Sequence, residues 1–178
     1  MGGIKNKIHG QLAAHNSQLP HLVSHLVADV PVDIRSILYV PGRRPSGPLD
    51  VRADYGLKLY ARGVLIQEHN KDLLPNHFRF VEGVVESEDL PLNVSREILQ
   101  QNKVIDRIRG AAVKKILGKL ESMAQDEPEA YASFWQTFGQ VLKEGPIEDF
   151  ANRERVAKLL RFASTHGDTA EQTVSLED

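Results

Sequence analysis

The sequence contains no cysteine among its 178 residues. A chain without cysteine can form no disulfide framework, and it has no thiolate to serve as a metal ligand or as a catalytic nucleophile. This absence fits a reducing compartment, and we predict a cytoplasmic location.

Long apolar runs and a surplus of one charge are also lacking. No stretch approaches the ~20 apolar residues that a membrane-spanning helix needs, and the opening Met-Gly-Gly-Ile-Lys lacks the apolar core of a secretory signal. Lys and Arg number 22 against 24 Asp and Glu, which gives a net charge of −2. Because strongly electrostatic nucleic-acid binders are basic, we expect neither a nucleic acid nor a membrane as a partner.

The composition is that of an ordinary globular chain, with 41 % hydrophobic and 26 % charged residues. Strand patterns concentrate in the first half. Residues 33–40 carry apolar side chains on both alternating faces, which predicts a strand in a sheet covered at least partly on two sides. Residues 57–62 predict a half-buried strand, Gly63 a bulge or junction before the apolar run 64–66, and residues 78–85 a further strand.

Helical patterns fill the second half. Apolar residues recur every three or four positions over 105–123 and form one stripe. Residues 126–128 are typical of a helix start, an aromatic stripe that we interpret as core follows, and Gly145-Pro146 ends the pattern. A last helix is expected from about 152 to 162. Strands followed by helices predict an α/β or α+β protein with helices packed on a small sheet.

Histidines are concentrated near the start of the chain, at His9, His15, His21 and His25. The last two are four residues apart, a spacing that could bind a metal if the segment were helical. No glutamate follows His21, as a zinc-protease motif requires. Solvated or capping histidines are the simpler interpretation, so we predict no metal site. Residues 1–18 are expected to be mobile or to form a poorly docked helix, and residues 1–30 together are set apart as an N-terminal segment that is expected to be mobile.

Nothing in the sequence forms a complete active site by itself. There is no nucleophile elbow. Glu82, Glu86, Glu88 and Asp89 lie close in sequence, but they lack the loop spacing of a calcium site. We interpret them as a solvated acidic edge.

The most informative segment runs from Glu88 to Lys103 and passes from an acidic loop through a proline into a short predicted helix. If this helix begins at Asn93, then Asn93, Arg96 and Gln100 share one side. A guanidinium beside two carboxamides suits a phosphate or a carboxylate. Spacing alone leaves open a simpler alternative, in which Arg96 is a solvated arginine near a helix N-cap.

The order of residues in this segment resembles the signature of the middle domain of the ninety-kilodalton heat-shock chaperone family, of the bacterial high-temperature protein G type. The similar run is Glu88-Asp-Leu-Pro-Leu-Asn-Val-Ser-Arg-Glu-Ile-Leu-Gln-Gln101. Further matches lie in the family's order between residues 34 and 162, among them Leu38-Tyr-Val-Pro41, Leu73-Leu-Pro-Asn76, Arg79-Phe-Val-Glu-Gly-Val-Val85 and Lys158-Leu-Leu-Arg-Phe162.

The resemblance implies a fold and a division of the chain. Residues 31–163 would form the larger α-β-α part of the middle domain, a three-layer sandwich with a small mixed sheet in its first half and a helical second half. Residues 164–178 would be a polar tail leading to the remainder of the protein. Two stretches depart from the family: residues before Val32 match poorly, and Pro45-Ser-Gly-Pro48 stands where relatives usually have Pro-Phe-Asp.

The resemblance also implies a role in an ATP cycle. In the family, a preceding domain holds ATP, and the middle domain contributes an arginine to the γ-phosphate. That role falls on Arg96, with Gln100 assisting and Asn93 shaping the loop. The segment would bind no cofactor by itself and would be inactive alone, whereas the complete protein would use ATP with Mg to control the binding of client proteins.

Further partners follow from the same resemblance. The N-terminal ATP-binding domain would dock on Leu65, Leu90 and Leu92, with ordinary core leucines as the alternative for Leu65 and Leu90. Leu65 stands where the family often has Phe. A C-terminal dimerisation domain of the same chain would make the complete protein a homodimer.

Two other classes of function are open at the level of sequence. A scaffold could use the basic loop at Arg43-Arg44 and the helices to bind a protein or a nucleic acid without any ATP cycle. An independent metal-dependent enzyme could use the N-terminal histidines. Salt-dependent nucleic-acid binding would favour the first, and zinc binding would favour the second.

Overall fold

Five strands form one sheet in a computed structural model that describes residues 19–43, 55–92, 102–165 and 171–176. β5 pairs with β3 in parallel and with β2 antiparallel, and the other pairings are antiparallel. The sheet is therefore mixed, as predicted. In chain order its strands are β1 (Leu22–Ala28), β2 (Ile34–Val40), β3 (Leu57–Ala61), β4 (Val64–Asn70) and β5 (Glu82–Glu86), and across the sheet they run β1-β2-β5-β3-β4.

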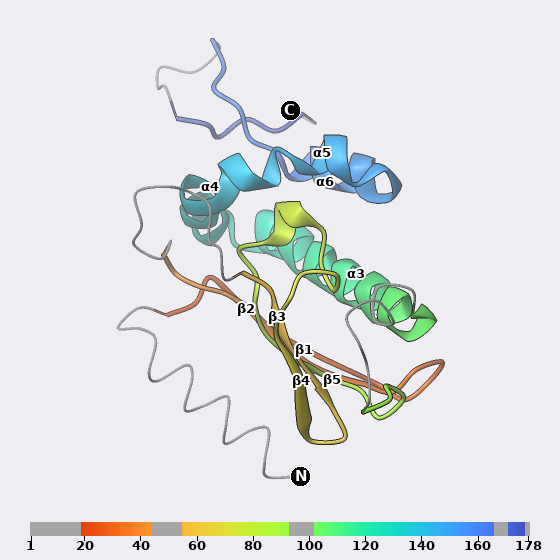
Figure 1. Cartoon of the computed structure of the whole chain (residues 1–178). Coiled ribbons are helices and arrows are strands. Elements are labelled where there is room, and N and C mark those ends of the chain that lie inside the picture. Colours follow the sequence, from red (N-terminus) through yellow and green to blue (C-terminus); the bar gives the residue numbers. More distant parts are fainter. Residues whose placement is uncertain (1–18, 44–54, 93–101, 166–170, 177–178) are drawn as a thin grey trace.

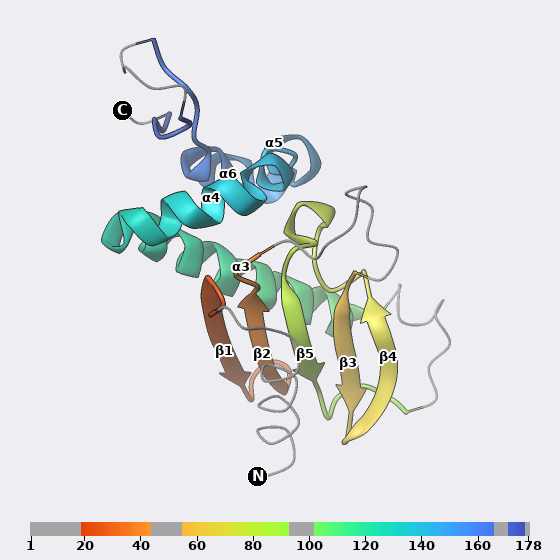
Figure 2. The same cartoon turned by 90° about the vertical axis from the view of Figure 1, so that its left-hand side faces the viewer.

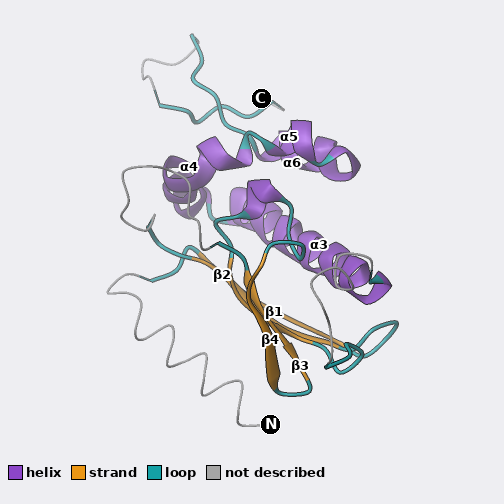
Figure 3. Cartoon of the chain, in the orientation of Figure 1, coloured by secondary structure: helices purple, strands orange, loops and turns teal. Residues whose placement is uncertain are grey.

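The described helices follow the last strand, apart from one short 3₁₀ turn (Figure 3). The longest, α3, crosses one face of the sheet, and the later helices lie beyond the end of the sheet (Figures 1 and 2). The predicted α/β class is confirmed. The helical elements are η1 (Asn76–Phe78), α3 (Lys103–Asp126), α4 (Pro128–Leu142), α5 (Gly145–Glu148), η2 (Phe150–Asn152) and α6 (Arg153–Leu159).

Burial alternates along the strands and fixes the side of the core. In β2, Ile34, Leu38 and Val40 are buried, whereas Arg35 between them is exposed. The buried face meets the apolar stripe of α3, in which Ile108, Ile116 and Leu120 are fully buried. The described helices supply one helical layer against the sheet, and the second layer of the predicted α-β-α sandwich is not among them.

Strand β1 lies within residues 1–30, where the sequence pattern predicted no strand. It pairs with β2 over its whole length, from Leu22 opposite Val40 to Ala28 opposite Ile34. The helical arrangement considered for His21 and His25 is therefore wrong. Four residues of extended chain span about 13 Å, so the two side chains cannot share one metal ion. The part of the chain that the structure describes holds no cluster of three potential metal ligands.

The strand predicted over residues 78–85 begins later than expected. Phe78 belongs to η1, which is closed by a hydrogen bond from the Phe78 N–H to the Pro75 carbonyl (2.9 Å), and β5 starts only at Glu82. Within β5, Gly83 has φ +143°, and a Cβ there would lie 2.1 Å from the Ile37 carbonyl oxygen. Only glycine allows this close approach of β5 to β2.

Helix ends also differ from the pattern. α4 ends at Leu142, and Gly145-Pro146 starts the short helix α5 rather than only ending the previous one. α6 stops at Leu159. Phe162 instead pairs with Val174 in an isolated bridge, which attaches the described part of the C-terminal tail. No described helix is long and apolar enough to cross a membrane.

Candidate interdomain site at the end of the sheet

The predicted phosphate-facing segment lies between two described elements, the loop after β5 and the start of α3. β5 ends at Glu86, the loop 87–92 follows, and α3 begins at Lys103. Asn93, Arg96 and Gln100 lie outside the described residues. The site is therefore built here from the two flanks that hold this segment and from the surface around them.

The first anchor is a reciprocal pair of hydrogen bonds between the loop and the start of β2. The Asp33 N–H donates to Asp89 Oδ2 (2.8 Å), and the Glu88 N–H donates to Asp33 Oδ1 (3.2 Å). The Asp89 N–H donates to the Ser87 hydroxyl oxygen at 3.3 Å. Ionised carboxylates are strong acceptors for backbone N–H groups. The loop is thus fixed at its exit from the sheet.

The second anchor comes from the β3–β4 hairpin. Its two central residues, Arg62 (φ +49°) and Gly63 (φ +79°), both have positive φ, which is the geometry of a two-residue type I′ turn. The Arg62 Nε donates to the Glu88 carbonyl (3.2 Å), and the Gly63 N–H donates to Glu86 Oε1 (2.7 Å). The hairpin and the loop after β5 therefore meet at one end of the sheet (Figure 1).

Strand pairing extends into the loop. The Ser87 N–H donates to the Tyr60 carbonyl at 3.1 Å, and Ser87 is fully buried. The acidic residues of this region therefore do not form a simple solvated edge. Glu86 and Asp89 accept backbone N–H groups, and Glu82 accepts the Tyr39 hydroxyl at 2.8 Å. Their carboxylates hold the chain in place.

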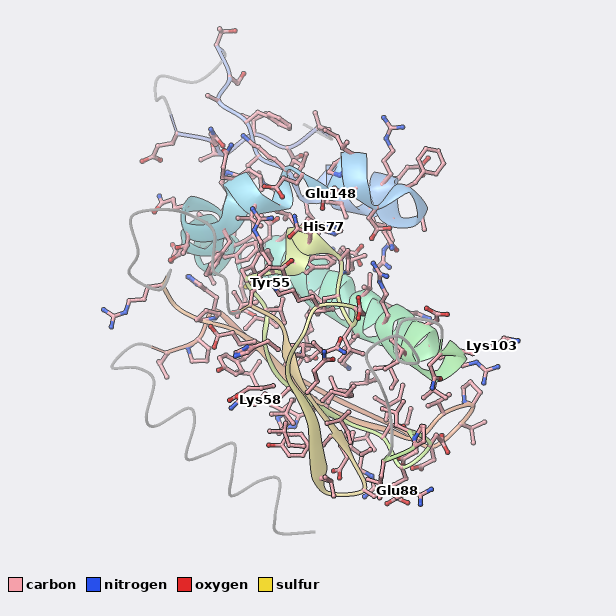
Figure 4. The ribbon with its side chains drawn as sticks, viewed as in Figure 1. Tyr55, Lys58, His77, Glu88, Lys103 and Glu148 are labelled. Carbon is pink, nitrogen blue, oxygen red and sulfur yellow. The ribbon has the colours of Figure 1, made fainter. Side chains whose placement is uncertain are left out.

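The other flank is the start of α3. The Asn102 side chain accepts the Val104 N–H (2.8 Å) as an N-cap, and Asn102 itself is extended (φ −90°, ψ 118°). Asp106 in the first turn complements the positive end of the helix. α3 therefore begins at Lys103, which Figure 4 labels at the start of the helix. The segment 93–101 is bounded by this cap.

The predicted docking leucines occupy different environments. Leu65 in β4 is 45 % exposed and Leu92 in the loop is 46 % exposed. Leu90 is only 1 % exposed and belongs to the hydrophobic core. For this residue, the alternative of an ordinary core leucine therefore agrees with the structure. Val64, which is not among the predicted docking residues, is also exposed in the same strand. The exposed apolar side chains at this end of the sheet are thus Val64, Leu65 and Leu92. Val64 and Leu65 are neighbours in β4, so they point to opposite faces of the sheet.

A second polar cluster lies at the opposite end of the molecule, where η1 meets α5. Figure 4 shows His77 and Glu148 there, far from Glu88. Arg79 donates from both terminal guanidinium nitrogens, Nη1 and Nη2, to the Glu144 carboxylate, which holds the pKa of Glu144 below its usual range. His77 is fully buried, and burial lowers its pKa. Since these partners come from segments distant in sequence, no local pattern pointed to this cluster.

Comparison with known proteins adds an independent finding. The family model described as "Hsp90 protein" matches residues 10–178. The chain is 52 % identical over 165 residues to a protein of Methylococcus capsulatus named chaperone protein HtpG, covering 93 % of this chain and 26 % of the relative. HtpG proteins of Coxiella burnetii and Chromobacterium violaceum are 50 % and 53 % identical, with the same coverage.

These relatives are much longer than the chain. The chain spans about a quarter of the length of the curated proteins that it matches. The match begins at residue 10, so it includes β1 and most of residues 1–30, which were expected to match the family poorly.

Proposed function

Because this chain belongs to the Hsp90 family, we propose that it is the middle-domain segment of an ATP-dependent chaperone and that its Arg96 acts on ATP held by another domain. The observation that supports this most directly is the loop 87–92. This loop, which precedes Arg96 in the sequence, is held by hydrogen bonds to Asp33 at the start of β2 and to the β3–β4 hairpin. A short segment that starts from a fixed loop and ends at a helix cap can present an arginine at a defined place.

The chemistry suits an arginine. Charge builds on the phosphoryl oxygens during ATP hydrolysis, and a planar guanidinium stabilises this charge without transferring a proton. Gln100 would add a donor at the phosphate or at the domain junction, and Asn93 would shape the loop. In other phosphoryl-transfer enzymes an inserted arginine contributes roughly 10³ to 10⁵ in rate. We expect less here, because domain closure often limits such cycles.

The ATP-binding domain would dock on the exposed apolar side chains beside this loop. Leu65 and Leu92 offer such a surface, and Leu90 supports the loop from within the core. In the complete protein, Mg would accompany ATP, a C-terminal domain would make a homodimer in the cytoplasm, and client proteins would bind according to the nucleotide state. The segment alone would hydrolyse no ATP.

The test is ATP turnover and ATP affinity of the complete protein carrying Arg96→Ala. We expect turnover to fall at least about tenfold with little change in ATP affinity, since the arginine acts on the transition state or on the closed state. The control is Arg107→Ala, which removes an exposed arginine of α3. Unchanged turnover in the Arg96 variant would rule out the proposed role and would favour an ATP-independent binding scaffold.

A further inference from the structure

An open groove lies between strand β1, at one edge of the described sheet, and helix α3. α3 crosses the sheet and continues past β1, which is the edge strand among the residues that the structure describes (Figure 2). Between them lies an open groove of about 430 Å³. Its lining consists of one strand residue and one face of the helix: Leu26 from β1, and Ala111, Lys114, Lys115, Gly118, Lys119 and Ser122 from α3.

Small residues keep the groove open. Ala111, Gly118 and Ser122 are small. They share one side of α3 with Lys115, because the four residues follow one another at spacings of three and four. Gly118 has no side chain, and a Cβ built on it meets no atom within 4 Å. A methyl group would meet no neighbouring atom at this position, so the space above the glycine is open to a ligand.

The groove carries a local excess of positive charge. Lys114, Lys115 and Lys119 all line it, and none of them forms an ion pair with a carboxylate in the part of the chain that the structure describes. The acidic residue of the same stretch, Glu121, is instead bound by Arg155 at 2.8 Å. The chain as a whole has a net charge of −2, so this concentration of lysines is a property of the groove.

The backbone of β1 forms the other wall. Among the described strands, β1 lies at the end of the strand order and pairs with β2 on one side. The N–H and C=O groups on the outer side of an edge strand are a template for a further strand. A strand added there would lie about 4.8 Å from β1. Every second side chain would point toward the α3 side of the sheet, where Lys115 and Lys119 line the groove.

We propose that this groove binds an extended acidic peptide segment of another protein, which adds a strand to β1 and places alternate carboxylates against Lys114, Lys115 and Lys119. Main-chain hydrogen bonds would supply affinity, and the lysines would supply specificity for acidic side chains. The proposal does not depend on the role of Arg96, because the binding requires no ATP and is measured on this chain alone.

The test uses fluorescence anisotropy with a short labelled peptide that alternates glutamate with valine. We expect the peptide to bind and the binding to weaken as salt is raised. A peptide with lysine in place of glutamate should not bind. Gly118→Leu fills the groove and should weaken binding at least about tenfold, as expected when a buried contact surface is blocked. The matched control is Gly110→Leu, since Gly110 is also in α3 and also faces open space, but lies outside the groove.

Two further variants separate the charges from the strand edge. Lys115→Glu combined with Lys119→Glu should abolish binding of the acidic peptide, whereas Lys103→Glu, at the far end of α3 (Figure 4), should leave it unchanged. A peptide methylated on alternate backbone nitrogens should bind weakly, because it cannot pair with β1. Equal binding of the lysine peptide, or of the methylated peptide, overturns the proposal. So does full binding to Gly118→Leu, or a preference for a single-stranded oligonucleotide over the acidic peptide.

Discussion

Arg79 and Glu144 form a two-pronged ion pair, with Nη1 2.5 Å from Oε2 and Nη2 2.8 Å from Oε1. The pair connects the end of η1 to the residue that precedes α5. Asn76 from η1 also points its amide at Glu144 and Glu148, at 3.4 Å each. This contact fastens the C-terminal helices to the segment that leads into β5.

We predict that Arg79→Met destabilises the protein by about 1 kcal/mol, the upper end of the range for partly exposed ion pairs. The Glu144 side chain is more than a third exposed, so solvent screening limits the effect. Chemical denaturation measures it. Lys103→Met, a change in an exposed basic residue at the start of α3, serves as the comparison. An Arg79 variant as stable as the wild type would mean that the pair contributes nothing net.

The same pair predicts a response to acid. The hydrogen bond from Arg79 lowers the pKa of Glu144. A carboxylate with a lowered folded pKa stabilises the fold above its unfolded pKa of about 4.3, and this stabilisation is lost as the pH falls through the folded pKa. The free energy of unfolding of wild type should therefore drop more steeply below about pH 4 than that of Arg79→Met. Parallel curves would contradict this.

His77 predicts a separate response at milder pH. Burial lowers its pKa, which outweighs the opposing effects of Asp149, Glu148 and Glu144. The unfolded state therefore takes up a proton first, near its ordinary pKa of about 6.5, and stability should decrease as the pH falls below this value. The slope of stability against pH between about 5 and 7 should flatten in His77→Phe. His25→Phe, on the exposed side of β1, should keep the wild-type slope.

Gly83 offers a test of the close approach between β5 and β2. Gly83→Ala would place a Cβ against the Ile37 carbonyl oxygen in a backbone conformation that L-residues rarely adopt. We expect a loss of about 3 kcal/mol or more. In contrast, Gly110→Ala should gain about 0.5–1 kcal/mol, because Gly110 sits in a helix beside open space. Thermal and urea denaturation of both variants measure the difference, and a tolerated Ala at 83 would contradict the structure.

The strands that the sequence predicted well are those whose apolar residues lie on the buried face. β2 and β3 have this pattern. β1 was missed because its pattern is inverted in part: the buried position Ser24 is polar, whereas the outward-facing Val23 and Val27 are apolar and exposed. Only the pairing with β2 makes this segment a strand, and pairing between distant segments cannot be derived from local alternation.

The candidate site shows the same limit. The resemblance selected the segment around Arg96, but the residues that anchor its loop are remote in sequence. Asp33 is 56 residues from its partner Asp89, and Arg62 is 26 residues from Glu88. The exposure of the leucines could not be predicted from the sequence either. Leu90 and Leu92 lie two residues apart after the same acidic loop, and only tertiary packing buries the first and exposes the second.

The contrast between these leucines gives the last prediction. Leu90→Ala removes a core side chain and should destabilise the isolated chain by about 2–5 kcal/mol. Leu92→Ser and Leu65→Ser change exposed positions and should alter its stability by no more than about 0.5 kcal/mol. In the complete protein, however, the two exposed variants should lower ATP turnover if these side chains contact the ATP-binding domain. Normal stability with reduced turnover is the signature of a docking surface. Normal stability with normal turnover would assign Leu65 and Leu92 no part in docking, whereas a large loss of stability would place them in the core.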